Sequence, residues 1–273
     1  MTHAAHRRPA VVALFLSLFL VVPIVEAGPA VAAPATRTQA AAAPSSNALE
    51  VLGNLLARLL PPPPAPAAPT LPPAVVSQVL ASTVRVNGLA CGVRVAGSGF
   101  SPAPDVIVTN AHVVAGNTAT SVLRPDGKTL PAVVQVFDPK RDLAVLSVPG
   151  LGEPSLPVGS AATGETDAIF GHPQGQAAVR VLPATVTRHV TADIGDIYDQ
   201  PGAVRQILVL NATLIPGDSG SALVNRAGQV VGVAFATASL RRATSFAVAS
   251  EELAPVLAQP RGGAVSTGPC LED

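Results

Sequence analysis

The sequence predicts an all-β protein built from two antiparallel β-barrels, with one short helix near the C-terminus. From about residue 75 onward, Val-rich segments of five to ten residues are bounded by Gly, Pro, Asn and Asp, a pattern typical of strands joined by tight turns. About eleven or twelve such segments occur without alternating helices, which argues against a parallel α/β sheet and favours barrels or a sandwich. A weak stretch near residues 151–159 divides them into halves of similar length, so we expect barrels over about 81–158 and 160–250.

The first 33 residues have the features of an export signal. His and Arg residues between positions 3 and 8 precede an uncharged apolar run from Val11 to Val25, and small residues follow it. A basic start, a short apolar run and an Ala-rich end are typical of a secretory signal peptide. Because the run is shorter than the ~20 residues that cross a bilayer as a helix, we expect a cleaved signal, with an uncleaved anchor as the alternative. Both interpretations place the rest of the chain outside the cytoplasm.

Residues 34–74 have the composition of a linker. Ten prolines occur from Pro34 to Pro73, and the stretch 61–73 favours polyproline II, which would form a stiff spacer of about 40 Å. Leucines between 49 and 60 recur at helical spacing. They predict a short helix without a function of its own, or one that packs on the folded domain, a membrane or a partner.

Two hairpin turns and one helix complete the predicted elements. Asp126-Gly127 and the stretch 225–228 carry turn residues between strand-like segments. Almost no helical periodicity occurs between residue 75 and Ser250. At Ser250, one serine and two glutamates predict a short helix with a hydroxyl at the N-cap and acids that suit the helix dipole.

Charge and composition exclude several classes of protein. Seventeen basic side chains balance seventeen acidic ones, and only 12% of residues are charged, which argues against a nucleic-acid partner held by a positive patch. Twenty-three glycines in 273 residues are too few for collagen. After the N-terminal run, no apolar stretch approaches spanning length.

Three segments near strand ends carry side chains that suit nucleophilic catalysis. Their central residues are His112, Asp142 and Ser219. Attack on an amide by a serine needs a base for the hydroxyl proton, and imidazole is such a base near neutral pH. The imidazole in turn needs a buried carboxylate that fixes its tautomer and stabilises its charged form. The order His, Asp, Ser along the chain matches one known order of this triad.

The glycine-rich turn Gly217-Asp218-Ser219 supplies backbone N–H donors for a developing oxyanion. Taken singly, each motif has a simpler interpretation: a structural histidine, a turn aspartate and an ordinary hairpin turn. An α/β-hydrolase is excluded, because residues 217–221 lack the last glycine of G-x-S-x-G and strands surround them. The conjunction of all three motifs favours a catalytic triad.

On these residues, the chain resembles the trypsin-like serine proteases of the chymotrypsin fold, on the bacterial HtrA-like side of that superfamily. TNAHVVAG, DLAVL and PGDSGSAL stand where that group has its catalytic histidine, aspartate and serine, and the resemblance covers about residues 81–257. The GSGF stretch ahead of the histidine motif extends the resemblance to the periplasmic acid-resistance proteases of mycobacteria and related actinobacteria. It implies two perpendicular six-stranded barrels with the site in the cleft between them.

The chain departs from this family in two respects. Only sixteen residues follow Leu257, so the PDZ domain of HtrA proteases is not expected. Many relatives also place a serine after the nucleophile strand to support the catalytic carboxylate, whereas Ala234-Phe235-Ala236 offers no hydroxyl. We expect Thr109 or a backbone amide to take that role, or the triad to be looser.

The two cysteines, Cys91 and Cys270, are expected to form a disulfide, because an exported chain meets an oxidising environment. Such a bond encloses about 180 residues and contributes about 4 to 5 kcal/mol in the loop-entropy model. Control of activity by its reduction is the alternative role. Two cysteines and no HExxH motif predict no metal site, and we expect no cofactor.

By resemblance, the pocket for the residue before the cut lies among residues 212–214 and 234–237, with Thr213, Ala236 and Thr237 as its lining. The absence of an acid there predicts a preference for small or medium apolar side chains rather than Lys or Arg. His172 and His189 are interpreted as ordinary surface or loop residues.

These observations predict an exported serine endopeptidase that cleaves polypeptides through an acyl-enzyme intermediate. The alternative is a catalytically inactive, protease-like binding module of the cell envelope. We expect a secreted, periplasmic or envelope location, with membrane association only through the N-terminal segment. The expected divisions are a signal peptide or anchor (1–33), an Ala/Pro-rich linker (34–74), the protease domain (75–260) and a tail (261–273).

Overall fold

The structure, a computed structural model of the 273-residue chain, describes residues 71–238 and 243–271, which belong to one compact unit. The export segment expected over 1–33, the leucine stripe and nearly all of the expected linker lie outside the described residues. None of the helices within the described ranges is long and apolar enough to cross a membrane.

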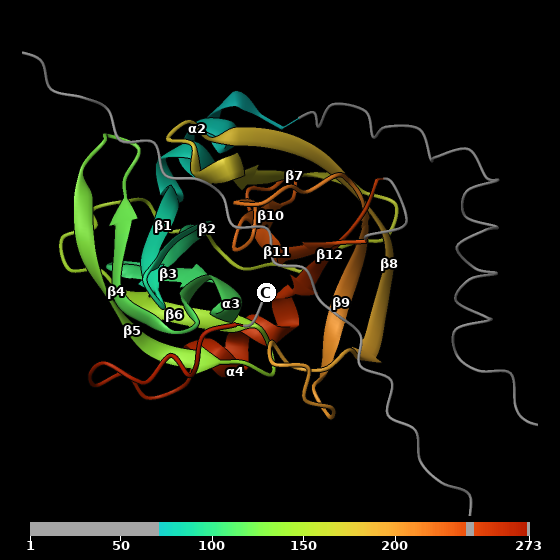
Figure 1. The fold of residues 1–273 in the computed structure, drawn as a ribbon. Coiled ribbons are helices and arrows are strands. Elements are labelled where there is room, and N and C mark those ends of the chain that lie inside the picture. The colour runs from blue at the N-terminus through green and yellow to red at the C-terminus, as the bar shows by residue number, and fades with distance from the viewer. Residues whose placement is uncertain (1–70, 239–242, 272–273) are drawn as a thin grey trace, which may run out of the picture. The chain divides into compact units, whose positions relative to one another are not determined.

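The first barrel closes six antiparallel strands in the order β1-β2-β3-β6-β5-β4, on the left of Figure 1. The single helical turn α3 (Ala111–Val114) lies between β3 and β4. Fully buried aliphatic side chains such as Val84, Ile107 and Leu146 fill the interior. The strands are β1 (Thr83–Ala90), β2 (Val93–Ala103), β3 (Val106–Thr109), β4 (Asn117–Leu123), β5 (Thr129–Asp138) and β6 (Leu143–Ser147).

The second barrel closes six antiparallel strands in the order β10-β11-β12-β9-β8-β7, on the right of Figure 1. Its interior is packed by residues such as Ile169, Leu208 and Leu223. A short 3-10 turn, η1 (Pro173–Gly175), follows the first strand. The strands are β7 (Thr166–Gly171), β8 (Arg180–Asp193), β9 (Val204–Asn211), β10 (Ala222–Val224), β11 (Val230–Thr237) and β12 (Thr244–Ala249).

The predicted all-β fold with two six-stranded barrels is confirmed. Both predicted hairpin turns are present as well. Gly127 and Gly228 have φ of +83° and +79°, and their N–H groups close turns onto the carbonyls of Arg124 and Asn225 at 3.0 Å. Glycine suits both positions because a positive φ carries no steric cost without a Cβ.

Two helices were not predicted: the single turn α3 and a longer helix at the start of the described residues. The segment Pro73–Ser82 forms α2, so the expectation of almost no helix before Ser250 is wrong. The helix was not recognised in the sequence because it contains three valines and follows a proline-rich segment, and β-branched residues favour strands. Tertiary packing decides the conformation instead: Val79 is fully buried in a core cluster shared by both barrels, and Val76 packs against that cluster.

The predicted C-terminal helix is confirmed, but its start differs from the expectation. The chain enters a 3-10 turn, η2 (Ser250–Glu252), and continues as α4 (Leu253–Leu257). Ala249 takes the N-cap position without a side-chain cap, and the Ser250 hydroxyl contacts Glu251 at 3.4 Å instead. The helix is therefore stabilised by packing, since Leu253 and Val256 are fully buried between the barrels.

The C-terminal segment is attached to the first barrel. Cys91 in the β1–β2 turn forms the expected disulfide with Cys270. The Gly116 N–H donates to Thr267 O at 3.0 Å, and the Val265 N–H donates to a carbonyl of β5 at 2.9 Å. The tail thus lies along the barrel that carries α3.

Candidate active site

His112 lies on α3, directly after β3 at the edge of the first barrel. Its Nδ1 lies 2.9 Å from Oδ2 and 3.0 Å from Oδ1 of Asp142, and its backbone N–H donates to Oδ1 at 3.0 Å. This geometry favours the tautomer in which Nδ1 carries the hydrogen and Nε2 keeps its lone pair. Burial lowers the pKa of His112, but the charge and hydrogen bond of Asp142 outweigh burial, so the pKa lies above its ordinary value.

Asp142 lies at the end of the β5–β6 turn, and its side chain is only 3% exposed. Its φ of +54° is in the left-handed region, which a non-glycine residue adopts only when its surroundings hold it there. The buried Asn110 side chain provides one such contact, because its Nδ2 donates to the Asp142 carbonyl at 2.8 Å. The sequence analysis missed Asn110, although it stands two residues before His112 in the same motif.

Ser219 follows a tight turn between β9 and β10. The Asp218 N–H donates to Ile215 O at 3.0 Å, with Gly217 inside the turn at a φ of +95°. Asp218 therefore cannot donate to an oxyanion, which corrects one of the three predicted donors. The N–H groups of Gly217 and Ser219 have no hydrogen-bond acceptor among the residues that the structure describes.

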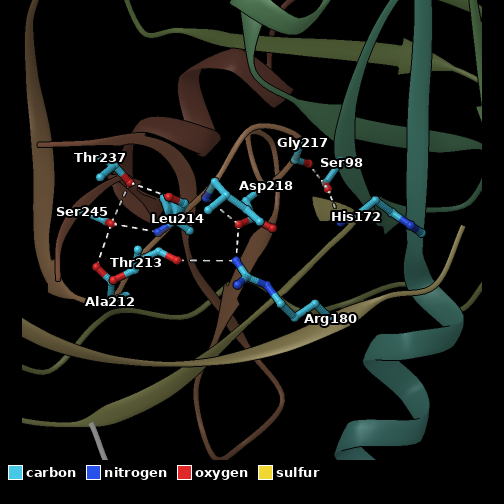
Figure 2. Close-up of polar contacts among 11 residues, drawn as sticks. Ser98, His172, Arg180, Ala212, Thr213, Leu214, Gly217, Asp218, Thr237 and Ser245 are labelled. Carbon is cyan, nitrogen blue, oxygen red and sulfur yellow. Dashed lines mark hydrogen bonds and ion pairs between the residues drawn. The ribbon is translucent and has the colours of Figure 1, made fainter. Parts of the chain in front are cut away.

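Ser98, the serine of the GSGF stretch, connects the first barrel to this turn (Figure 2). Its hydroxyl donates to Gly217 O at 2.7 Å and accepts the His172 N–H at 2.8 Å. Its backbone N–H donates to Ser219 O at 2.8 Å, and its carbonyl accepts the Thr109 hydroxyl at 2.7 Å. These contacts tie the carbonyls of Gly217 and Ser219 to the first barrel, a role that was not predicted from the sequence. The peptide that carries the Gly217 N–H is held through Pro216 O, which accepts the Gln174 N–H at 2.6 Å.

The carboxylate of Asp218 forms an ion pair with Arg180 of β8 (Figure 2). Its Oδ2 also accepts the Ile215 N–H at 2.9 Å. Burial raises the pKa of Asp218, although the Ile215 amide and Arg180 both oppose that rise. Arg180 is thus a second missed residue, and it holds the turn from the side opposite Ser98.

The structure places Ser219 beside the helix that carries His112. A Cβ added at Gly97 would lie 2.7 Å from the Val113 side chain and 3.0 Å from Ser219 O, so the serine backbone and α3 meet across this glycine. Within residues 71–238 and 243–271, however, no hydrogen bond joins the Ser219 hydroxyl to His112.

A pocket of about 220 Å³ opens next to the serine. Ala236 and Thr237 line it as predicted, but Thr213 does not: its side chain is exposed, and its carbonyl accepts a hydrogen bond from Arg180 at 3.5 Å. No charged side chain occurs among the lining residues, which are Leu214, Ile215, Pro216, Ser219, Phe235, Ala236 and Thr237.

The polar groups around this pocket satisfy one another (Figure 2). The Thr237 hydroxyl lies 3.0 Å from Leu214 O and 3.0 Å from the hydroxyl of Ser245. Ser245, which is fully buried, donates to Ala212 O at 2.9 Å and accepts the Leu214 N–H at 3.2 Å. A ligand side chain in the pocket therefore meets mainly apolar surface.

The Asp142 carboxylate was expected to be supported by Thr109 or by a backbone amide, or to be held more loosely. Thr109 donates to Ser98 and does not contact Asp142, whereas the backbone amide of His112 donates to the carboxylate. In the stretch 234–236, where a supporting hydroxyl was expected from the resemblance, Phe235 instead lines the pocket.

The two remaining histidines of the described chain differ in burial. His189 is exposed on β8, as expected for a surface residue. His172 lies in the loop between β7 and η1, as the expectation of a surface or loop residue allowed, but it is only 2% exposed and therefore not on the surface. Burial lowers the pKa of His172, which favours a neutral ring whose Nδ1 faces Gln176 O at 3.0 Å. Over the described residues, no three His, Cys, Asp or Glu side chains form a group that could hold a metal ion.

The fold and the arrangement around Ser219 define a class of protein. Residues 97–233, about half of the chain, match the trypsin-like peptidase domain, and the two barrels have the arrangement of chymotrypsin-like proteases. The chain belongs to the trypsin-like serine protease family, on its HtrA side.

Two particular relatives place it within that family. Serine protease Rv3671c of Mycobacterium tuberculosis strain H37Rv is 36% identical over 207 residues, which cover 72% of this chain and 51% of that protein. Serine protease HTRA2, mitochondrial, of Bos taurus is 35% identical over 169 residues, which cover 58% of this chain and 34% of that protein. The chain thus spans about half the length of the mycobacterial relative.

Solved structures of the mycobacterial protease have the same fold. The active form of the Rv3671c protease from M. tuberculosis gives a TM-score of 0.70 at 33% identity, over 78% of this chain and 98% of that one. The inactive form gives a TM-score of 0.63 at 33% identity, over 73% and 98%.

Proposed function

We propose that this chain is an exported serine endopeptidase that cleaves polypeptides through an acyl-enzyme intermediate. In this proposal, His112, Asp142 and Ser219 form the catalytic triad. The observation that carries the proposal is that the Asp142 carboxylate accepts hydrogen bonds from both the ring and the backbone N–H of His112. That contact orients an imidazole base on α3, next to a serine in a glycine turn.

The proposed reaction begins with attack of Ser219 Oγ on the scissile carbonyl while His112 Nε2 takes the hydroxyl proton. Asp142 stabilises the imidazolium through Nδ1 and remains ionised. The imidazolium then gives the proton to the leaving amine, and an ester joins the acyl group to Ser219. Water activated by the same imidazole hydrolyses the ester and regenerates the enzyme.

The N–H groups of Gly217 and Ser219 are the proposed oxyanion donors. They have no acceptor among the described residues, and the peptide that carries the Gly217 N–H is held by the hydrogen bond from the Gln174 N–H to Pro216 O at 2.6 Å. Donors that are fixed before the reaction stabilise the developing charge without reorganisation.

We propose that the pocket binds a small or medium apolar side chain immediately before the cleaved bond. Its volume of about 220 Å³ and its lack of charged lining residues support this preference. Ala236 and Thr237 form its wall together with Leu214, and Thr213 has no part in it. Cleavage of a peptide library should be strongest after residues such as Ala, Val or Leu, and strong cleavage after Arg would contradict this assignment.

The proposed organisation is an export signal or anchor over 1–33, an Ala/Pro-rich linker from residue 34, a folded protease domain to about residue 260 and the tail 261–273. Because α2 packs on the inter-barrel core, the folded domain includes residues from Pro73, two before the expected start at 75. A Chlamydia pneumoniae relative, 36% identical over 143 residues, is named a probable periplasmic serine endoprotease. That name supports a proposed location in the envelope or outside the cell.

One observation favours the alternative of an inactive, protease-like binding module: the Ser219 hydroxyl has no hydrogen bond to His112 among the described contacts. A serine-directed fluorophosphonate separates the two functions, because only an activated serine hydroxyl displaces fluoride from phosphorus. We expect the wild-type protein to gain one adduct, located on Ser219 by peptide mass spectrometry, and Ser219→Ala to gain none. Equal, weak labelling of both proteins would favour the binding module.

A further inference from the structure

Arg205 is a buried cation that the proposed reaction does not use. It lies on β9 in the second barrel and is only 4% exposed. Among the described residues, it forms no direct ion pair with a carboxylate. A buried guanidinium is costly unless its surroundings compensate for the lost hydration, so its contacts indicate what it is retained for.

The first contact is with the turn that carries Asp142. Arg205 Nη1 donates to Lys140 O at 2.5 Å, two residues before the carboxylate. The neighbouring residues of that turn also reach the second half of the chain: the Ile197 N–H donates to Pro139 O at 3.3 Å, and Arg141 Nε lies 2.9 Å from Glu252. The turn belongs to the first barrel, so these contacts fasten it across the barrel interface. Arg205 is the most deeply buried of the residues that make these contacts.

The second contact is with the pocket wall. The guanidinium carbon lies 5.4 Å from the ring centroid of Phe235, a cation–π geometry. Phe235 lines the pocket beside Ser219. One side chain therefore connects the turn of Asp142 with the wall next to the serine.

The charge of Arg205 acts on both members of the His112–Asp142 pair. It disfavours a proton on the ring, so it lowers the pKa of His112 against the stronger, opposite effect of Asp142. Burial lowers the pKa of Arg205 itself, and the surrounding carboxylates oppose that effect. The charged groups near Arg205 are Asp142, Glu252, Asp138 and Asp196, with Arg141 paired to Asp138 and Glu252.

We infer that Arg205 is a positioning residue for the proposed catalytic pair: it fixes the Asp142 turn to the second barrel and supplies the buried positive charge that faces His112 and Asp142. The inference rests on the proposed function of His112, Asp142 and Ser219. Arg205 contacts the turn and the pocket wall, and acts on the reaction through these contacts and through its charge.

The test is the titration of His112 by NMR in protein labelled at histidine Cε1, with Ser219→Ala as background to prevent self-digestion. The signal is assigned by its loss in His112→Gln. Arg205→Gln is expected to raise the pKa of His112, because a cation that disfavours protonation is removed. Arg188→Gln, at an exposed arginine of β8 in the same barrel, is the matched control and should leave that pKa unchanged.

With Ser219 restored, the acidic limb of kcat/KM should move to higher pH by the same amount in Arg205→Gln. Arg205→Lys keeps the charge but not the planar fork, so it should retain the midpoint while kcat falls by about tenfold or more. If Arg205→Gln does not fold, as judged by its thermal transition, Arg205→Lys still decides the positioning role: unchanged kcat would overturn it.

An unchanged His112 pKa in folded Arg205→Gln would overturn the electrostatic role, even if activity fell. Failure of the proposed function gives a different result. In that case the wild-type protein is not labelled by the fluorophosphonate, while the shift of the His112 signal in Arg205→Gln persists.

Discussion

Asp167 makes the stability of this protease sensitive to pH in a direction that can be measured without any substrate. It lies on β7 in the second barrel, is 1% exposed, and its Oδ2 has no hydrogen-bond partner in the described part of the chain. Burial, aided by the nearby Glu165, raises the pKa of this carboxyl from 3.8 to about 7. Replacement by the isosteric Asp167→Asn removes the titration and keeps the volume.

The direction and size of the change in unfolding free energy with pH follow from the linkage between proton binding and folding. Because the folded protein binds the proton more tightly than the unfolded chain, the contribution of Asp167 is fully present below about pH 4 and is lost as pH rises through 7. Each pKa unit corresponds to about 1.4 kcal/mol, so the wild-type protein should lose roughly 4 kcal/mol over this interval. The Asn variant lacks this loss, since its amide stays neutral throughout.

Urea unfolding between pH 4 and pH 8 measures the difference in free energy of unfolding between wild type and Asp167→Asn. That difference should shift by several kcal/mol in favour of the variant as pH rises, and other titrating groups cancel in it. Asp126→Asn, at a carboxyl of the β4–β5 hairpin whose side chain is 39% exposed, is the control. If the wild-type and Asp167→Asn curves run parallel across this range, the assignment of a raised Asp167 pKa is refuted.

Three further outcomes follow from the site. Ser98→Ala leaves the Gly217 carbonyl and a buried N–H without their shared hydroxyl, so kcat should fall by about 10- to 100-fold with little change in KM, as measured with a peptide substrate. Arg180→Gln leaves the Asp218 carboxylate unpaired and should cost about 2 kcal/mol in urea unfolding, less than a fully buried pair because Arg180 is 32% exposed. Reduction of the disulfide, which joins residues 179 positions apart, should lower the free energy of unfolding by about 5 kcal/mol, measured with and without reductant.

The strands, their division into two barrels and the three motif residues were predictable because each depends on local sequence. Alternation, turn residues and short polar motifs are encoded within about ten residues. The conformation of α2 could not be predicted from the sequence, because its valines favour a strand and only the packing of Val79 between the barrels selects the helix. His172 was misjudged for the same reason, since its burial comes from tertiary contacts.

The residues that support the proposed site depend on contacts that no local pattern encodes. Ser98 reaches Gly217 across 119 positions in sequence, and Arg205 reaches Lys140 across 65. The one usable signal was negative: Ala234-Phe235-Ala236 offers no hydroxyl for the carboxylate, which indicated that another group must support it. Charge composition gave no hint, because a single buried arginine does not change a balanced total.

The central claim is that Ser219 forms an acyl-enzyme with His112 as base and Asp142 as its orienting carboxylate. The most direct measurement mixes the protein with an activated ester and records the intact mass during the first turnovers. The account predicts a burst of product and one acyl adduct on Ser219 in the wild-type protein, a much slower adduct in Asp142→Asn, whose geometry is kept but whose tautomer is wrong, and none in Ser219→Ala. Turnover of the ester without an adduct on Ser219, or adduct formation at equal rates in wild type and Asp142→Asn, would contradict it.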